Sequence, residues 1–260
     1  MLNKRIILLV AVVILLSSTV VVQASTSTID KSQLNKGVIV INYKSKDGAA
    51  VKITKGDKKQ DYILTGDNSF PLRFGEGDYT IMVLEKVTGK GYKQVEKEVV
   101  TFKPENENDI YLQSIQSISW NKDMEAIKKA KELTKDAKTD KEKVAAVYDY
   151  IVKNVTYDYK KASTVKSGYI PSVDDIFRSA EGICYDYSTL FAAMLRSVGV
   201  PTKLVKGNKN DIKEYHAWNE VYLQETKEWV TIDTTYDASM KKGNVSTTMI
   251  KNANEYKLDK

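Results

Sequence analysis

The spacing of apolar residues changes once along this chain of 260 residues, and that change limits the folds open to it. Before about residue 112, short β-branched and aromatic runs such as GVIVINYKS and DYTIMVLEK alternate with Gly- and Asp-rich turn signals. This pattern is typical of short antiparallel strands. After about residue 119, apolar residues recur three and four positions apart, which is the spacing of one helix face. We therefore expect an α+β protein with a β-rich part first and a mixed part second.

The β-rich part, residues 36–112, is predicted to form an antiparallel β-sandwich of about six or seven strands. It contains no histidine, no cysteine and no recognisable nucleotide-binding loop. We expect it to serve as a spacer, or as a module that binds the cell envelope or a partner. The polar residues 25–35 before it are predicted to be a flexible leader. Residues 113–260 form the second predicted domain.

The N-terminus has the pattern of an export signal. Lys4 and Arg5 precede an uncharged apolar run, and Val22-Gln23-Ala24 offers small residues where a signal peptidase reads them. An uncleaved membrane anchor is the alternative, but the 17 residues 6–22 are few for a spanning helix. We expect cleavage after Ala24, so that residues 1–24 are a signal peptide and no stable membrane span remains. The predicted location is secreted or associated with the cell envelope.

The charge pattern argues against a nucleic-acid partner. The formal net charge is +6, and it falls to +4 when Lys4 and Arg5 are removed. Lysines and glutamates are interspersed, so no basic patch is expected. With one cysteine and one histidine, a zinc site is not expected unless carboxylates dominate it, and no acidic spacing suits a calcium loop. No metal or cofactor is predicted.

Cys184, the only cysteine, stands at the head of the helix predicted from EGICYDYSTLFAAML. A single cysteine excludes an internal disulfide, and in an exported chain it suggests an intermolecular bridge or a reactive thiol. The free N–H groups and the dipole at a helix N-terminus favour a thiolate and can stabilise an oxyanion. By position alone, however, a buried packing residue is the more common role for such a cysteine.

His216, the only histidine, makes a reactive thiol more credible. It lies in the predicted strand EYHAWNEVYL on the same face as Trp218, and imidazole is the natural base for a thiol. Asp233 on the next predicted strand is diagonal to His216 if the hairpin loop has two or four residues. A loop of odd length would turn it to the other face. Asp237 is a rival partner, which we place beyond the strand end.

Three motifs carry a resemblance to a known family: GxCxDYSxLFxxxLRxxGVP, then HAWNEVYL, then WVTIDTTYD. In this order, over about residues 144–237, the chain resembles a secreted, bacterial-type member of the transglutaminase-like superfamily, which has a papain-like fold. The resemblance implies a catalytic triad of Cys184, His216 and Asp233. It also implies that the cysteine-bearing helix packs on an antiparallel sheet that holds the other two residues. The β-rich part lies outside the resemblance.

The family is chemically mixed, with cross-linking acyltransferases, peptidases, other amide hydrolases and inactive relatives. The resemblance therefore implies thiol-dependent acyl transfer or amide hydrolysis, without naming the substrate. We expect a protein or peptide substrate, with cell-envelope components as further candidate partners. A cysteine peptidase of the same fold and a non-catalytic envelope-binding protein are the alternatives.

The groups around the triad are less constrained. The Cys184 N–H is one expected oxyanion donor. Tyr157 and Tyr159 in a long loop, or Tyr185 beside the cysteine, could supply a phenol as the second donor, although aromatic packing is the more common role. Trp218 is expected either as a wall beside the histidine or as a core residue.

Overall fold

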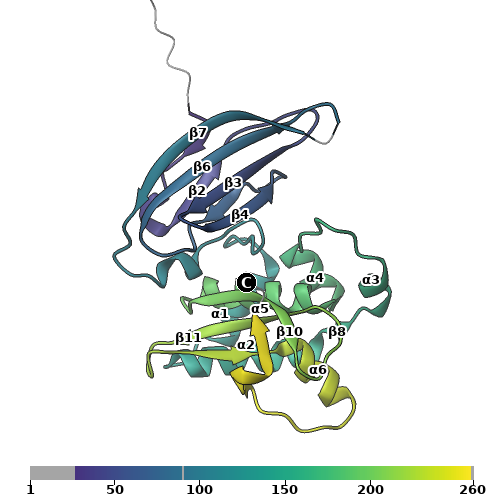
Figure 1. Cartoon of the computed structure of the whole chain (residues 1–260). Helices are drawn as coiled ribbons and strands as arrows, with labels where there is room; N and C mark the ends of the chain where they lie inside the picture. Colours follow the sequence, from purple (N-terminus) through teal and green to yellow (C-terminus); the bar gives the residue numbers. More distant parts are fainter. Residues whose placement is uncertain (1–26, 90, 259–260) are drawn as a thin grey trace, which may run out of the picture.

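The structure, a computed structural model, describes residues 27–89 and 91–258 (Figure 1). The predicted signal peptide lies outside these residues. Within the described ranges, no helix combines the length and the apolar character needed to cross a bilayer. Figure 1 shows a unit made mostly of strands, in purple and blue, above a teal, green and yellow unit of helices and strands. The expected α+β composition with antiparallel sheets is confirmed.

The first unit has two antiparallel sheets, with strand orders β1-β2-β5 and β4-β3-β6-β7. Buried residues of both sheets, Ile39 and Phe70 from one and Ile53 and Ile81 from the other, belong to one apolar cluster. The elements of this unit are β1 (Ile29–Asp30), β2 (Val38–Ile41), β3 (Ala49–Lys55), β4 (Lys58–Ile63), β5 (Ser69–Pro71), β6 (Gly77–Lys86), β7 (Tyr92–Phe102) and the 3-10 helices η1 (Leu34–Lys36) and η2 (Asp109–Leu112).

The stretch predicted to be a flexible leader, residues 25–35, contains part of this unit. Ile29 pairs with Ile41 across β1 and β2, and its side chain is buried in the cluster. The prediction was wrong for residues 29–35, because one apolar residue among polar neighbours is a weak signal until a partner strand covers it.

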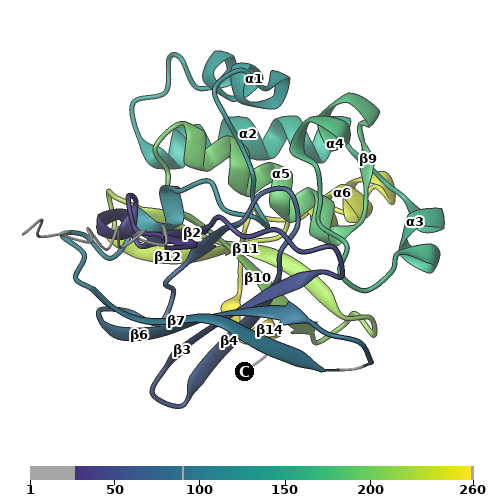
Figure 2. The same cartoon turned by 90° about the horizontal axis from the view of Figure 1, so that it is seen from above.

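The second unit places a layer of helices on a five-stranded antiparallel sheet of order β13-β12-β11-β10-β14. Figure 2 shows α1, α2, α4 and α5 together on one side of this sheet. The elements are α1 (Glu125–Leu133), α2 (Asp140–Asn154), β8 (Thr156–Tyr157), α3 (Tyr159–Thr164), α4 (Val173–Ser179), β9 (Glu181–Gly182), α5 (Cys184–Ser197), β10 (Thr202–Lys209), β11 (His216–Leu223), β12 (Glu228–Ile232), α6 (Thr234–Lys242), β13 (Ile250–Lys251), η3 (Ala253–Glu255) and β14 (Tyr256–Leu258).

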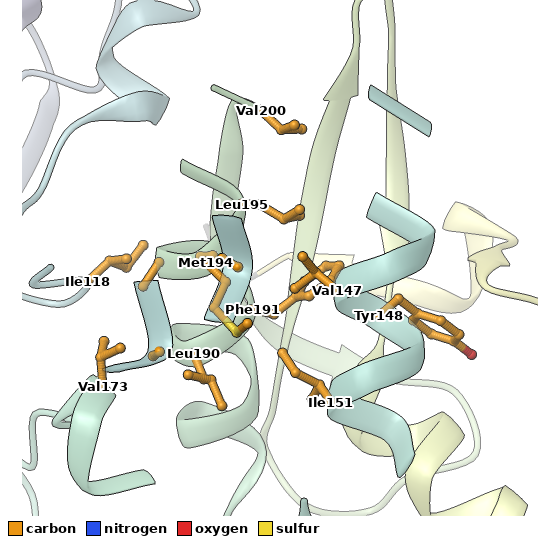
Figure 3. Close-up of a cluster of buried hydrophobic side chains, with 14 of the residues drawn as sticks. Ile118, Val147, Tyr148, Ile151, Val173, Leu190, Phe191, Met194, Leu195 and Val200 are labelled. Atoms are coloured by element: carbon orange, nitrogen blue, oxygen red, sulfur yellow. The ribbon is translucent and has the colours of Figure 1, made fainter. Parts of the chain in front are cut away.

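Helix α5 is the centre of this unit, because it is apolar on nearly every side and is covered by helices and sheet alike. Its Leu190, Phe191, Met194 and Leu195 are fully buried, and Figure 3 shows them among side chains from α2 and α4. A helix enclosed in this way has little freedom to shift, so its first residue, Cys184, is held in a defined place.

Local sequence rules explain where the neighbouring helix begins. Thr139 caps α2, since its side chain accepts from the Glu142 N–H, and Glu142 reaches back to the Thr139 N–H. This is a capping box, and it satisfies two backbone donors that a helix start leaves free. By contrast, residues 153–172, predicted to be a loop, contain the short elements β8 and α3.

The two units are joined by polar contacts from the segment that links them. Gln116 donates its backbone N–H to Ser69 O at 2.9 Å and its side chain to Ile63 O at 2.9 Å. Buried Arg196 on α5 donates to Gln113 O at 2.5 Å. The linker therefore bonds to the strand unit on one side and to α5 on the other.

Gly207 on β10 is a position at which only glycine fits. It pairs with His216 on one side and with Leu258 of β14 on the other. An added Cβ would lie 2.0 Å from Lys257 O and 3.0 Å from the Trp218 ring. We expect Gly207→Ala to lower the free energy of unfolding by about 1–3 kcal/mol, because a backbone oxygen cannot move aside without displacing β14.

Urea denaturation measures this change, with Gly66→Ala as the matched control. Gly66 has no atom near its Cβ position and no left-handed φ, so its substitution should change the free energy of unfolding by less than about 0.5 kcal/mol. Equal effects of the two substitutions would show that β14 does not press on β10 as described.

Candidate active site

Cys184 is the first residue of α5 and is half-buried. The parallel pairing of β8 with β9, Tyr157 opposite Gly182, sets the direction in which the chain enters the helix. Gly182 is required there, because an added Cβ would lie 2.6 Å from the Asp186 Cβ. The first N–H groups of a helix have no partner within it, so the Cys184 N–H is available to an oxyanion beside the thiol.

His216 begins β11 and is 5% exposed. Its Nε2 lies 2.7 Å from Asp233 Oδ2, and its side chain also hydrogen-bonds the Cys184 thiol. Since Nε2 is engaged by the carboxylate, Nδ1 is the nitrogen that faces the sulfur. The structure thus brings the three predicted residues together in the order Cys184, His216, Asp233.

The position of Asp233 follows from the register that the sequence allowed. Leu223 pairs with Glu228, which leaves a four-residue turn, and Asn219 pairs with Ile232. The next position brings Asp233 level with Trp218, diagonal to the histidine, as predicted. One detail differs: β12 ends at Ile232, and Asp233 caps α6 by accepting the Tyr236 N–H at 3.0 Å. The aspartate is held by a helix start as well as by the sheet.

Asp233 is fully buried, and a third group satisfies its carboxylate. Tyr256, from the C-terminal strand β14, donates its hydroxyl to Asp233 Oδ2 at 3.2 Å. Burial raises the pKa of Tyr256 far above its ordinary value, and the negative charge and hydrogen bond of Asp233 raise it further, so the phenol stays a donor. The sequence analysis missed this residue, because a lone aromatic residue in a polar tail has no distinguishing pattern.

The rival aspartate serves another contact. Asp237 is fully buried on α6, where it accepts the Tyr148 hydroxyl at 2.8 Å and pairs with Lys251. These partners come from α2 and β13. Asp237 therefore bonds α6 to its neighbours, and it lies past the strand end as expected.

His216 titrates unusually because of its surroundings. Burial lowers its pKa, but the hydrogen bonds to Asp233 and Cys184 and the negative charges of both outweigh burial and raise the pKa to about 9. The imidazole is therefore protonated at neutral pH. The ring thus carries a positive charge within hydrogen-bonding reach of the Cys184 sulfur.

The aromatic candidates lie in different settings. Tyr157 is half-buried. Its burial raises the pKa of its hydroxyl to about 12, and the charge of Cys184 contributes to the rise, so Tyr157 remains a neutral phenol near the thiol. Tyr159 is 71% exposed and contacts the Tyr157 ring edge-on, at 5.0 Å between centroids. Trp218 was expected either as a core residue or as a wall beside the histidine, and it is both. It is 1% exposed in a small core with Tyr256, and its ring stacks on that of His216 with 6.3 Å between centroids.

Tyr185 is half-buried, and its ring makes a cation–π contact with a lysine. The Lys206 ammonium lies 3.4 Å from the centroid of its ring. Burial raises the pKa of Tyr185 to about 12, so its hydroxyl stays protonated. Lys206 was not predicted as a site residue, because the strand TKLVKG carries no sign of what faces it.

A polar cluster that the sequence analysis also missed bonds the long loop to the cysteine helix. Asp186, fully buried in the first turn of α5, accepts the Ile183 N–H at 2.9 Å and the Tyr169 hydroxyl at 2.6 Å. The Lys161 ammonium lies 2.6 Å from Asp186 Oδ2 and also 2.6 Å from the Tyr169 hydroxyl oxygen. The ammonium neutralises a carboxylate that would otherwise place an uncompensated negative charge two residues from Cys184.

Metal binding finds no support among residues 27–89 and 91–258. No group of three or more His, Cys, Asp or Glu residues there could hold an ion.

The single histidine makes the proton on His216 directly measurable. Its Cε1–H resonance needs no assignment, and we expect it to titrate near pH 9 in an NMR experiment, against an ordinary value of 6.5. Asp233→Asn should move the midpoint to lower pH, since the carboxylate charge is lost. A midpoint at or below 6.5 in the unsubstituted protein would contradict this account of the site.

The raised pKa of His216 also makes the free energy of unfolding depend on pH. Because the pKa is raised in the folded protein, its contribution is fully present below about pH 6.5 and is lost as the pH rises through about 9. At most, this contribution is about 3 kcal/mol. The free energy of unfolding should therefore fall less steeply between pH 6.5 and 9.5 in Asp233→Asn than in the unsubstituted protein.

Comparison with known proteins supports the assignment of this region. Residues 127–234, which include all three site residues, match the transglutaminase-like superfamily. The uncharacterized protein YebA of Bacillus subtilis (strain 168) is 31% identical over 180 residues, 61% of this chain and 23% of YebA. Kyphoscoliosis peptidase of Homo sapiens is 30% identical over 120 residues, 42% of this chain and 18% of the peptidase. The chain thus matches less than a quarter of either relative.

A solved structure with a similar arrangement is the periplasmic domain of TgpA from Pseudomonas aeruginosa. It is 14% identical, with a TM-score of 0.42, over 82% of this chain and 94% of that domain.

Proposed function

We propose that this chain, which belongs to the transglutaminase-like superfamily, carries out thiol-dependent acyl transfer or amide hydrolysis on protein or peptide substrates. The observation that carries the proposal is the unbroken series of contacts from Cys184 through His216 to Asp233. A nucleophile within reach of a base, with that base oriented by a third group, is the arrangement that nucleophilic catalysis needs. The chain has no second cysteine or histidine that could take either role.

In the first half-reaction, the thiolate attacks the carbonyl carbon of a carboxamide or peptide bond. A C–S bond forms, and the negative charge on the carbonyl oxygen is stabilised by the Cys184 N–H and the start of α5. The C–N bond then breaks, and His216 gives its proton to the departing nitrogen. The raised pKa of His216 keeps that proton on the ring at neutral pH until the leaving group needs it.

In the second half-reaction, an amine or water attacks the thioester. His216, now neutral, accepts a proton from the attacking group, and the C–S bond breaks to return the thiolate and imidazolium. A lysine acceptor yields an isopeptide bond, and water yields a carboxylic acid. Asp233 supports both halves, since it holds the ring and stabilises its charged form.

The first unit has a separate proposed role. We infer that its two sheets act as a β-sandwich that spaces the active site or binds a partner or the envelope. The hydrogen bonds of Gln116 to Ser69 and Ile63 favour a fixed placement of this unit beside the catalytic one.

An amine-incorporation assay tests the proposal. The mature protein is incubated with casein and a fluorescent primary amine, and label on casein is followed. We expect Cys184→Ala and His216→Ala each to reduce incorporation by at least about a thousandfold, because members of a triad act as a unit. Cys184→Ala should melt near the unsubstituted protein, whereas His216→Ala should melt lower, because it leaves the buried Asp233 carboxylate without its imidazole partner.

The matched control is Glu220→Gln, which lies on the same strand as His216 but pairs with Lys203 away from the triad. It should retain incorporation. Label that persists equally in Cys184→Ala would refute the acyl-transfer proposal and favour a non-catalytic binding protein.

Peptidase activity is the second candidate, and the relative described as a peptidase favours it. Gel analysis of the same reactions, without the amine, detects cleavage of casein. Fragments that depend on Cys184 and His216, in the absence of amine incorporation, would establish water as the acceptor.

The location of this activity is proposed from the N-terminal pattern alone. We infer export with cleavage after Ala24, because a short basic region, an apolar run and small residues follow in order. Mass spectrometry of the protein recovered outside the cytoplasm should find Ser25 as its first residue. Recovery of a membrane-embedded chain that retains residues 1–24 would contradict this and identify an anchor.

A further inference from the structure

Strand β10 carries Lys203, Lys206 and Lys209 at intervals of three residues. Each ammonium lies over the face of an aromatic ring, at a distance typical of cation–π contacts. The distances from Nζ to the ring centroid are 3.7 Å for Lys203 on Trp229, 3.4 Å for Lys206 on Tyr185 and 4.0 Å for Lys209 on Tyr236.

Two of these lysines also pair with carboxylates. Lys203 Nζ lies 2.9 Å from Glu220 Oε2, and Lys209 pairs with Asp211 and, at 3.8 Å, with Glu255. Lys206 has no such partner within residues 27–89 and 91–258, although its side chain is half-buried. A partly desolvated ammonium without a counter-charge is costly, so an anion is expected nearby.

The surroundings of Lys206 point to where that anion forms. Its ring platform, Tyr185, directly follows Cys184. On the sheet, Lys206 pairs with Ala217 and the neighbouring Gly207 pairs with His216, so Lys206 and His216 lie at the same end of the β10–β11 pair but project from opposite faces. The face that carries Lys206 is the one toward α5, since Asn219 on that face donates to Ser188 O of the helix. Burial lowers the pKa of Lys206, and the negative charge of Cys184 is the influence that opposes this.

We propose that the missing partner of Lys206 is the negative charge of the reaction itself, first on the Cys184 sulfur and then on the oxygen of the tetrahedral intermediate. Lys206 is then a catalytic residue that touches the reacting atoms, and it supplies the second stabilising group for the oxyanion beside the Cys184 N–H. The role of Lys206 at the oxyanion rests on the proposed acyl-transfer function, whereas its contact with the thiolate does not.

Alkylation of the single cysteine tests the contact without any substrate. At fixed neutral pH, the rate of Cys184 modification is measured with iodoacetamide, which is neutral, and with iodoacetate, which is an anion. We expect Lys206→Met to slow iodoacetamide roughly tenfold, and iodoacetate more than that, since a nearby unit charge acts on both the thiolate and the reagent. Lys206→Arg should keep most of both rates.

Lys203→Met is the matched control, because it removes a lysine from the same strand and from a similar ring contact. It should leave both alkylation rates and their ratio unchanged. If Lys206→Met also leaves them unchanged while the fold is intact by thermal melting, the proposal is overturned, and Lys206 is only a structural contact of Tyr185.

Turnover in the amine-incorporation assay tests the proposed role of Lys206 at the oxyanion. Lys206→Met should lower kcat by roughly ten- to a hundredfold with little change in KM, because the lost contact acts on the transition state. A rise in KM confined to acidic substrates, with unchanged alkylation by iodoacetamide, would overturn the proposal in favour of a substrate-carboxylate site. Absence of turnover in the unsubstituted protein would defeat the proposed function, while alkylation would still decide whether Lys206 faces the thiolate.

Discussion

The hydrogen bond from His216 to Asp233, 2.7 Å long and withdrawn from water, is the contact on which the candidate site depends. A buried carboxylate holds the imidazole charged and orients it, so the remaining ring nitrogen faces the thiol. Three separate parts of the fold maintain this bond: the β11–β12 register, the start of α6 at Asp233, and the hydroxyl of Tyr256 from β14. Residues distant in sequence thus converge on one carboxylate.

The uncompensated charges around Cys184 are positive. The start of α5, the imidazolium of His216 and the ammonium of Lys206 all place positive charge toward the cysteine. The nearest carboxylate on the same helix, Asp186, is compensated by Lys161 and Tyr169 from the long loop. The loop therefore contributes to the site by removing an opposing charge. A low-dielectric setting makes each of these effects larger than it would be in water.

Much of this protein could be predicted from local sequence rules, because those rules act over a few residues. The capping box of Thr139 and Glu142 and the buried face of α5 follow from spacing. The register that aligns Asp233 with Trp218 was one of two possibilities, and the four-residue turn of the structure selects it. The errors occurred where burial depends on distant partners. Ile29 looks solvated in its polar stretch until β2 covers it, and Asp233 belongs to a helix start that its strand-like sequence concealed.

The sequence by itself determined which residues are chemically capable, since one cysteine and one histidine leave no alternatives, and which elements carry them. Only the tertiary structure decided what surrounds them. Tyr256 reaches Asp233 from the C-terminal strand, Lys161 and Tyr169 reach Asp186 from a loop, and Lys206 lies over the ring of Tyr185 on the cysteine helix. The reason is physical: a hydrogen bond or charge effect depends on distance and burial, and chain spacing does not set these for residues on separate elements.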